Sequence, residues 1–261
     1  MDRLKHNLVY RSNQLVDFYS EHRRCWGDLY PSEKFIIKQA AGPEGRLGRV
    51  LDVGCATGGL GDALRERFDL SFYDGVDINA QCIDEAKRRQ RERGAQNLAF
   101  TCGDILNCDL GRDDGYDNVF SLSCADWNVA TAEIIERCWR SVSPGGHLII
   151  TLRLTPGQSL KSPTDSYQYI YFGPRLPGNR KDLEKAPYVV LNIRDALGLF
   201  LELSPRPASL AAYGYWGTPS PSAVTKYGRL VFTALLARKA PAAEQTSDMS
   251  FVSELPADLF I

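Results

Sequence analysis

Residues 49–61 decide the fold, and they read Arg-Val-Leu-Asp-Val-Gly-Cys-Ala-Thr-Gly-Gly-Leu-Gly. An apolar run over 50–53 breaks into a glycine-dense turn, and a helix-like segment over 60–67 follows it. The order strand, glycine-rich turn, helix brings a backbone close to a nucleotide-like ligand. Gly54 and Gly58 carry no Cβ, so the chain can turn tightly and a ligand can lie against the main chain. The sequence therefore predicts a ligand site over this turn.

The spacing of the turn is not that of a dinucleotide site. The pattern G-x-G-x-x-G needs a glycine at the position where Ala56 stands. Asp52 lies inside the end of the strand, where its carboxylate would repel an approaching pyrophosphate. A ligand with a positively charged end suits that carboxylate far better. A nicotinamide-dependent dehydrogenase is therefore the weakest interpretation.

Five segments in order resemble the class I S-adenosylmethionine-dependent methyltransferases. Residues 52–58 resemble the first motif of this family, and strand-like segments follow over 72–78, 98–105, 116–123 and 142–150. The resemblance covers roughly residues 49–155 and continues more weakly to about residue 240. It implies an α/β, Rossmann-like, doubly wound fold with a mostly parallel seven-stranded sheet, an N-terminal helical cap and a lid insertion after the fifth strand. The implied cofactor is S-adenosyl-L-methionine.

The resemblance also indicates which residues hold this cofactor. An acid at the end of the second strand, here Asp77, can accept both ribose hydroxyls. In the family an acid at the tip of the third strand, here Asp104, accepts the adenine amino group. Each of these two residues could instead be only a helix N-cap. The expected cofactor-binding residues are Asp52, Gly54, Cys55, Ala56, Gly58, Asp77, Ile78, Asp104, Ile105, Ser121 and Tyr30.

The catalytic candidates are less visible, because methyl transfer from a sulfonium depends mainly on alignment and desolvation. A general base is needed only if the acceptor must lose a proton early. We consider Asp126 as a base or as an orienting group, with a helix cap as the alternative. His22 is the most plausible base among the three histidines. Arg153 could bind an anionic group of the acceptor or pair with a structural carboxylate.

Two segments bear on the acceptor. Residues 121–128 lack the Asn/Asp-Pro-Pro-Tyr tetrad of amino-group methylases, which disfavours an exocyclic amine. Residues 156–190 are rich in proline, glycine and tyrosine, and we interpret them as a partly ordered substrate lid that suits a sugar ring or another flat polar molecule. We expect methyl transfer to a hydroxyl or carboxyl of a small metabolite. An RNA or protein methyltransferase and a non-catalytic S-adenosylmethionine-binding protein remain as alternatives.

Three parts are expected along the chain: a helical cap over 1–45, the cofactor-binding domain over 46–240 and a mobile tail over 241–261. Leu8, Val9 and Leu15 belong to an expected amphipathic first helix, and Pro31 lies near the first turn of a second one. On the cap, we expect Tyr19, His22, Trp26 or Tyr30 to line the pocket, with packing of the cap against the core as the alternative for each. Downstream, Asn192 begins a helix, and a strand pair covers 208–216 and 229–238.

Composition limits the partners. With a net charge of −1 the 261-residue chain has no general attraction to nucleic acid or to an anionic membrane. Seven cysteines without a C-x-x-C pair favour reduced thiols, and no cluster has metal-ligand spacing, so we expect no metal. No signal peptide and no apolar run of about 20 residues is apparent. These features favour a cytoplasmic protein, and the sequence leaves the oligomeric state open.

Overall fold

The computed structural model describes residues 13–109, 115–171, 173, 175–241, 244 and 248–261. Leu8 and Val9, which we expected in the first helix, lie outside the described residues.

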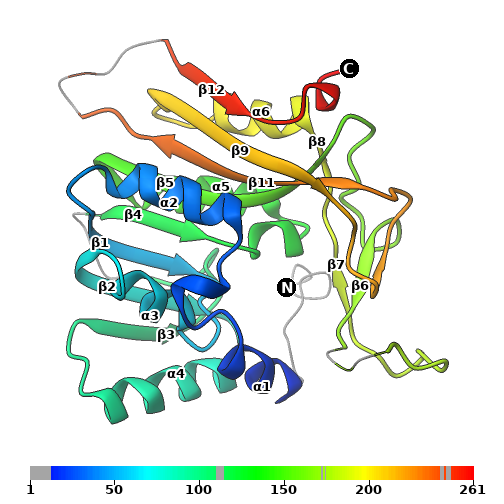
Figure 1. Ribbon diagram of the computed structural model, residues 1–261, viewed down its shortest axis with the longest axis horizontal. Coiled ribbons are helices and arrows are strands. Elements are labelled where there is room, and N and C mark those ends of the chain that lie inside the picture. Colours follow the sequence, from blue (N-terminus) through cyan, green and yellow to red (C-terminus); the bar gives the residue numbers. More distant parts are fainter. Residues whose placement is uncertain (1–12, 110–114, 172, 174, 242–243, 245–247) are drawn as a thin grey trace.

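One large sheet forms the centre of the molecule (Figure 1). Its strands are β1 (Arg46–Val53), β2 (Asp69–Asp77), β3 (Leu98–Cys102), β4 (Tyr116–Ser121), β5 (Val142–Thr155), β8 (Leu191–Asn192), β9 (Ser209–Gly217), β11 (Leu230–Arg238) and β12 (Ser250–Glu254). The strand order is β12-β9-β11-β5-β4-β1-β2-β3, and β8 pairs with β5. β1 to β5 pair in parallel, whereas β11 runs antiparallel to β5 and to β9.

This arrangement confirms the Rossmann-like, doubly wound fold. The seven strands from β3 across to β9 form the mostly parallel sheet that the resemblance implies, and β12 and β8 extend it. The strand pair expected over 208–216 and 229–238 is present as β9 and β11. The carboxyl ends of β1, β2 and β3 lie at the same edge of the sheet, because parallel strands in register end together.

Helices cover both faces of the sheet (Figure 1). They are α1 (Asn13–Glu21), α2 (Pro31–Ala41), α3 (Gly59–Arg65), α4 (Ala80–Arg93), α5 (Thr131–Arg140) and α6 (Ile193–Leu201), with short 3-10 turns η2 (Trp26–Asp28), η3 (Ala125–Trp127) and η5 (Ala257–Leu259). Local sequence explains several of their starts. Pro31 occupies the first position of α2, where a missing N–H costs nothing. The side chain of Asn79 accepts hydrogen bonds from two backbone N–H groups of α4, and Asn192 caps α6 as expected.

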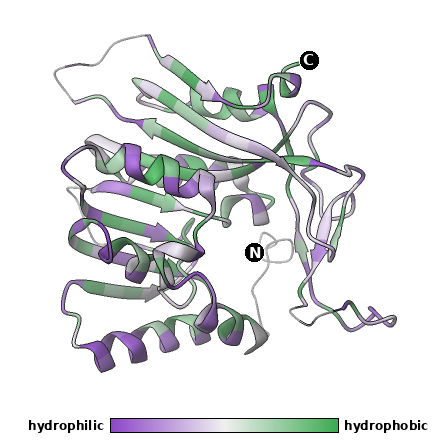
Figure 2. Ribbon diagram, viewed as in Figure 1, coloured by the Kyte–Doolittle hydropathy of each residue, from purple (hydrophilic) through white to green (hydrophobic). Residues whose placement is uncertain are grey.

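The core consists of two large clusters, one on each face of the sheet. Because strand side chains alternate, Leu51 and Val53 join the cluster under α5 and α6, whereas Val50 joins the cluster under α2, α3 and α4. Figure 2 shows many hydrophobic positions along the strands and many hydrophilic positions along α4. Both faces of the central strands are therefore buried, which explains their continuous apolar sequence.

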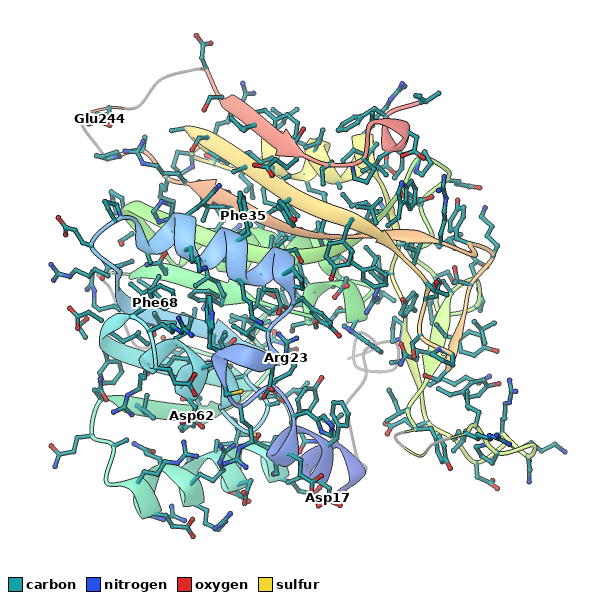
Figure 3. The ribbon with its side chains drawn as sticks, viewed as in Figure 1. Asp17, Arg23, Phe35, Asp62, Phe68 and Glu244 are labelled. Carbon is teal, nitrogen blue, oxygen red and sulfur yellow. The ribbon has the colours of Figure 1, made fainter. Side chains whose placement is uncertain are left out.

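The N-terminal cap packs against the sheet and against its first crossover. Phe35 of α2 stacks on Tyr213 of β9, with ring centroids 4.6 Å apart. Trp26 meets Phe68 edge-on at 5.3 Å, and the backbone N–H of Trp26 donates to Glu66. Figure 3 places Phe35 on the upper side of α2 and Phe68 near β1 and α3. These contacts fix the segment that leads from α1 to α2 over the glycine turn.

The insertion that we expected to be a lid contributes to a second, smaller sheet. This sheet has the order β10 (Ala223–Val224), β6 (Tyr167–Tyr169) and β7 (Lys185–Pro187), and all its pairs are antiparallel. It stands at the side of the molecule beyond the carboxyl end of β5 (Figure 1). β10 comes from the connection between β9 and β11, so two separate segments of the chain build it.

The described part of the C-terminal segment forms regular structure, unlike the mobile tail that we expected. β12 pairs in parallel with β9 and becomes an edge of the large sheet. Beyond it, Leu259 is fully buried, and Asp258 accepts a hydrogen bond from the Trp216 indole at 2.8 Å. Leu259 therefore docks onto the domain, whereas Phe260 and Ile261 stay exposed.

Candidate active site

The glycine turn between β1 and α3 has little room for side chains. Gly54 has φ +82°, and a Cβ there would lie 2.6 Å from the Cys124 sulfur. Gly58 has φ +79°, and a Cβ there would lie 2.7 Å from the Phe100 ring. Both positions combine a left-handed backbone with close packing, and only glycine meets the two requirements together.

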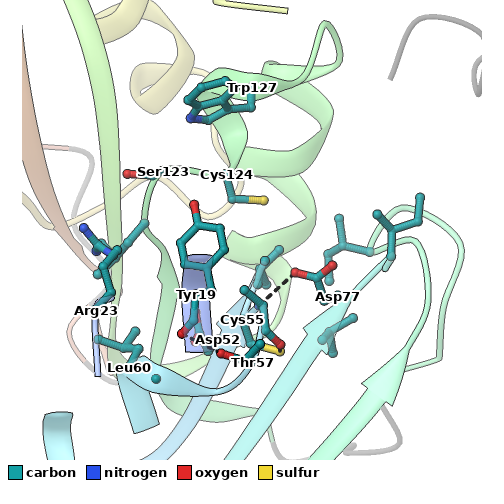
Figure 4. A pocket seen from close by; sticks show the side chains of 18 of the residues that line it. Tyr19, Arg23, Asp52, Cys55, Thr57, Leu60, Asp77, Ser123, Cys124 and Trp127 are labelled. Atoms are coloured by element: carbon teal, nitrogen blue, oxygen red, sulfur yellow. Dashed lines mark hydrogen bonds between the residues drawn. The ribbon is translucent and has the colours of Figure 1, made fainter. Parts of the chain in front are cut away.

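Asp77 holds this turn in place. One of its carboxylate oxygens accepts the backbone N–H of Ala56 at 2.9 Å (Figure 4), and the other accepts that of Asn79 at 2.8 Å. Burial raises the pKa of Asp77, while the two backbone hydrogen bonds lower it. The residue whose side chain caps α4 is Asn79. Asp77 therefore links the glycine turn to the segment after β2 through hydrogen bonds, and it lines the same pocket as the turn.

Asp52 is a buried carboxyl group at the end of β1. Its side chain is almost inaccessible, and the Tyr73 hydroxyl donates to it at 2.5 Å. Burial raises the pKa of Asp52 to about 7, against the lowering effect of the Tyr73 hydrogen bond. Asp77 raises this pKa further by charge repulsion, and Arg23 lowers it by attraction. This carboxyl therefore changes its charge near neutral pH.

These residues meet in one pocket beyond the carboxyl ends of β1 to β4 (Figure 4). Predicted site residues that line it are Asp52, Gly54, Cys55, Ala56, Asp77, Ile78, Asp104, Ile105 and His22. Tyr19, which we expected at the pocket on the cap, also lines it. The Asp104 carboxylate accepts hydrogen bonds from Leu106 N–H and from the Asn107 side chain, so it is held at the pocket edge.

Several predicted site residues do not line the pocket. Ser121 is fully buried within β4, because this strand position points into the core. Tyr30 is 55 % exposed and precedes α2 outside the pocket. Gly58 shapes the turn from behind, against Phe100, while its neighbours Thr57 and Gly59 reach the pocket wall. Trp26 packs on Phe68 instead of facing the pocket.

Arg153 and Asp126 pair with each other behind the pocket wall. Arg153 Nη1 donates to the Asp126 carbonyl at 2.8 Å, and Nε lies 3.3 Å from the Asp126 carboxylate. The guanidinium also lies 4.5 Å from the Trp127 ring centroid and 3.7 Å from that of Tyr188. Both charged residues are buried and neither lines the pocket. Arg153 therefore has the structural carboxylate partner that we named as an alternative.

Asp126 keeps one unexplained feature. Its second carboxylate oxygen is buried and has no hydrogen-bond partner among the described residues. Burial raises the pKa of Asp126, and Arg153 lowers it. The next two residues, Trp127 and Asn128, line the pocket, whereas Asp126 does not.

His22 is the catalytic candidate that reaches the pocket directly. Its ring is exposed, stacks on Phe18 at a centroid distance of 4.3 Å, and uses Nδ1 in a 2.8 Å hydrogen bond with the Phe18 carbonyl. Within the described part of the chain, Nε2 makes no hydrogen bond and pairs with no acid. His22 therefore remains a candidate base.

The residue at the pocket that sequence reasoning missed is Arg23. The described residues with positive φ other than glycine are Arg23, Ala56 and Ser123, and all three line the pocket. Such backbone conformations are costly outside glycine and gather at functional sites. The one available signal was proximity in sequence, because Arg23 follows Tyr19 and His22 on the cap.

Comparison with known proteins identifies the domain. Residues 50–146 match the family described as "Methyltransferase domain". These residues form a methyltransferase domain, and its fold is that of the class I S-adenosylmethionine-dependent methyltransferases. The matched range extends from β1 into the turn that opens β5, so it contains the glycine turn and the three acids of the pocket.

Solved structures support the fold of this methyltransferase domain. An S-adenosylmethionine-dependent methyltransferase from Clostridium acetobutylicum superimposes with a TM-score of 0.54 at 15% identity, over 87% of this chain and 99% of that one. Phosphoethanolamine N-methyltransferase 2 from Haemonchus contortus, in complex with S-adenosyl-L-methionine, gives a TM-score of 0.57 at 15% identity, over 88% of this chain and 58% of that one. At these identities the likeness concerns the fold.

Curated relatives match over shorter stretches. Trans-aconitate 2-methyltransferase from Deinococcus radiodurans is 30% identical over 112 residues, which are 43% of this chain and 40% of the relative. Malonyl-[acyl-carrier protein] O-methyltransferase from Priestia megaterium is 26% identical over 102 residues, 39% of this chain and 35% of the relative. The similarity thus spans less than half the length of either relative.

The residues of the methyltransferase domain fit S-adenosylmethionine chemically. The ribose hydroxyls, the adenine amine and the ammonium are hydrogen-bond donors, and the sulfonium is a cation. Asp52, Asp77 and Asp104 supply carboxylate oxygens along one pocket for such groups. A pyrophosphate would meet the same three acids unfavourably, which agrees with the spacing argument against a dinucleotide.

Other kinds of site receive no support. Across the described residues, no group of His, Cys, Asp and Glu side chains has the arrangement of a metal site. Within the same ranges, no helix combines the length and the apolar character that a membrane crossing requires.

Proposed function

We propose that this protein binds S-adenosylmethionine and transfers its methyl group to a hydroxyl or carboxyl of a small metabolite. The observation that carries the proposal is the alignment of three acids, Asp52, Asp77 and Asp104, at the ends of adjacent parallel strands beside one glycine turn. Together with the family match, this set indicates the polarity of the ligand along the pocket.

The two ends of the pocket have different assignments. Asp77 and Ile78 are proposed to hold the ribose, and Asp104 and Ile105 the adenine, at the side of β2 and β3. Asp52, at the end of β1, is proposed to face the amino-acid and sulfonium end. When bound, S-adenosylmethionine supplies an activated methyl group on a cationic sulfur.

The chain itself positions the acceptor and excludes water. Trp127 and Tyr19 line the pocket, with Trp127 on the side away from the glycine turn (Figure 4). Arg153 and Tyr188 hold Trp127 from behind, so the insertion over 156–190 supports this wall and is proposed to close over the acceptor. For a hydroxyl acceptor, His22 is proposed to accept the proton, whereas a carboxylate acceptor needs no base.

A small acidic or hydroxylated acceptor agrees with the relatives and the sequence. The names of two relatives specify trans-aconitate and malonyl-[acyl-carrier protein] as what those proteins methylate. The segment over 121–128 lacks the tetrad of amino-group methylases. The net charge of −1 provides no general attraction to nucleic acid.

Isothermal titration with S-adenosylmethionine and with S-adenosylhomocysteine tests the cofactor. We expect both to bind in the micromolar range, about −8 kcal/mol. Release of S-adenosylhomocysteine is then followed with a panel of hydroxy acids, dicarboxylic acids and sugars. Absence of binding contradicts the proposal. Binding without turnover on the panel favours a non-catalytic binding protein, and turnover on RNA or protein alone favours a macromolecular methyltransferase.

A further inference from the structure

The small sheet turns one of its two faces toward the wall of the pocket. Gln168 and Ala186 are paired across β6 and β7, and because side chains alternate along a strand they share a face with Tyr188. Tyr188 belongs to an apolar cluster against which Trp127 and Ala223 pack, and its ring meets the Trp127 ring edge-on at 5.9 Å. Trp127 in turn lines the pocket. We call this face the inner face of the small sheet.

The outer face of the small sheet has a different composition. Tyr167 and Tyr169 lie there, and the Lys185 ammonium lies 4.5 Å and 5.4 Å from their ring centroids. Lys185 pairs with Tyr169 across the strands, so these contacts agree with the alternation of faces. The charged group of the outer face therefore has partners on its own sheet, and the inner face is the one turned toward the pocket.

Unpaired polar atoms gather on the inner face. Ser166 Oγ, Gln168 Oε1 and Thr225 Oγ1 are buried and have no hydrogen-bond partner among the described residues. The Tyr188 N–H donates to the Ser166 carbonyl, which extends the pairing of β6 with β7 and places Ser166 across from Tyr188. Thr225 directly follows β10, and the register of β10 with β6 places it on the other side of Ser166. The three side chains therefore share one face.

A fourth unpaired oxygen lies next to this face. Asp126 Oδ1 is buried without a partner in the described part of the chain, while the other carboxylate oxygen lies near Arg153. The Asp126 carbonyl accepts the N–H of Val189, the residue after Tyr188, at 2.9 Å. Four of the seven unpaired buried side-chain oxygens of the described residues thus belong to one region, between the small sheet and the pocket wall, and isolated packing defects do not explain such a concentration.

Unpaired oxygens in one place indicate a missing hydrogen-bonding partner, because burying a polar group without a hydrogen bond is costly. The carboxylate and amide oxygens can only accept hydrogen bonds, whereas the two hydroxyls can also donate. An anionic ligand would bring further acceptors and a negative charge next to Asp126. Neutral hydroxyl groups bring the donors that these oxygens need. Ala186 and Ala223, which flank Gln168 on both sides, have no polar group that competes for them.

We propose that the inner face of the small sheet is the acceptor site, and that the acceptor is a neutral molecule with several hydroxyl groups, such as a sugar or a polyol. This inference rests on the proposed function. Ser166, Gln168 and Thr225 bind hydroxyl groups remote from the reacting one. Trp127 packs against an apolar side of the acceptor where the acceptor enters the pocket. The inner face thereby selects for hydroxyl groups and against carboxylates.

The first experiment compares two classes of acceptor. Saturation-transfer NMR on the protein loaded with S-adenosylhomocysteine detects binding of glucose, rhamnose and myo-inositol, and of malonate, succinate and trans-aconitate. The same compounds are then tested for turnover with S-adenosylmethionine. We expect binding and turnover with at least one sugar or polyol and with none of the dicarboxylic and tricarboxylic acids.

The two proposals fail in different ways. Turnover of one of the carboxylic acids, or no response to any sugar or polyol, overturns the inference and leaves the proposed function standing. If neither S-adenosylmethionine nor S-adenosylhomocysteine binds in calorimetry, the proposed function itself fails.

The variants Ser166→Ala and Thr225→Val test the inner face directly. Neither hydroxyl has a hydrogen-bond partner among the described residues, so urea denaturation should show unchanged or raised stability. In each variant the KM for the sugar or polyol should rise about 3- to 10-fold, the range for one hydrogen bond, with kcat and the affinity for S-adenosylhomocysteine within about twofold of the wild type.

Thr233→Val is the matched control. It removes another buried unpaired hydroxyl, which lies beside Gly214 in the large sheet, and it should leave the KM unchanged. An unchanged KM in both Ser166→Ala and Thr225→Val, or an equal rise in Thr233→Val, overturns the assignment of the inner face.

Discussion

At the scale of single residues, Asp52 links ligand charge to pH. Burial raises its pKa to about 7, so the carboxyl ionises as the pH passes through neutrality. A cationic ligand binds the ionised form better. The affinity for S-adenosylmethionine should therefore rise from about pH 6 to about pH 8, by roughly tenfold at most. S-adenosylhomocysteine lacks the sulfonium charge, so its affinity should rise less.

Calorimetric titration of both compounds across this range measures the effect, with Asp52→Asn as the control that cannot ionise. A ratio of the two affinities that stays constant with pH in the wild-type protein would refute this role. The pH dependence of the free energy of unfolding is a second test of the raised pKa of Asp52. The folded state holds a proton that the unfolded state releases above about pH 4, so the free energy of unfolding should fall as the pH rises from about 4 to about 7 and should level off above that. Asp52→Asn should lack this decline.

Asp77 has two tasks that a substitution should affect together. It is expected to bind the ribose, and it accepts the backbone N–H of Ala56. Asp77→Ala should weaken the binding of S-adenosylhomocysteine by about 1–3 kcal/mol, because hydroxyl donors and a backbone donor lose their acceptor. Titration calorimetry and urea denaturation measure the two effects. Asp69→Ala, at the exposed start of the same strand, should change neither. If Asp77→Ala leaves the affinity for S-adenosylhomocysteine unchanged, Asp77 has only a structural role.

At the scale of the element, the glycine turn depends on both backbone conformation and space. Gly54 and Gly45 both have positive φ, but only at Gly54 would a Cβ meet a neighbour, the Cys124 side chain. Gly45→Ala should therefore cost only the backbone strain, about 1 kcal/mol. Gly54→Ala should cost more and should also weaken cofactor binding, because the turn must shift.

Urea denaturation and calorimetry on the two variants separate strain from contact. Equal losses of stability, with cofactor binding intact in both, would show that the close approach of Gly54 to Cys124 has no consequence for the site.

At the scale of the whole molecule, the C-terminal segment completes the fold. Leu259 is fully buried in the cluster under α5 and α6, whereas Ile261 is 95% exposed. Leu259→Ala should lower the free energy of unfolding by about 2–5 kcal/mol through the cavity it leaves. Ile261→Ala should change it by less than about 0.5 kcal/mol. Urea denaturation compares the two, and equal stabilities would mean that this segment does not dock in solution.

The sequence predicted the acidic side of the pocket well. Asp52, Asp77 and Asp104 each end a strand of a predicted parallel sheet, and parallel strands place their carboxyl ends at one edge. The glycine turn was equally visible, because Gly54 and Gly58 mark a backbone that other residues cannot adopt. The strand pair after Asn192 followed from apolar runs and turn residues alone. Local periodicity and one topological rule are enough for all of these features.

Other site residues depended on contacts between distant parts of the chain. Arg23 enters the pocket because the cap docks on the turn, through a hydrogen bond between Thr57 and Tyr19, which are 38 positions apart. Arg153 does not line the pocket, because its side chain pairs with Asp126, 27 positions away. Neither partner can be read from local sequence, since the direction of each side chain follows from how the elements pack.

The sequence by itself therefore determined the fold, the glycine turn and the acids that face the proposed cofactor, because these follow from strand order and backbone geometry. Only the tertiary structure decided which charges remain at the pocket. Arg23 and His22 stay there, whereas Asp126 and Arg153 are buried against each other. It also gave the C-terminal segment its place as an edge strand. The physical reason is the same in each case. A buried charge needs an oppositely charged or hydrogen-bonding partner and an apolar side chain needs an apolar surface, and the packing of distant elements determines which partner is near.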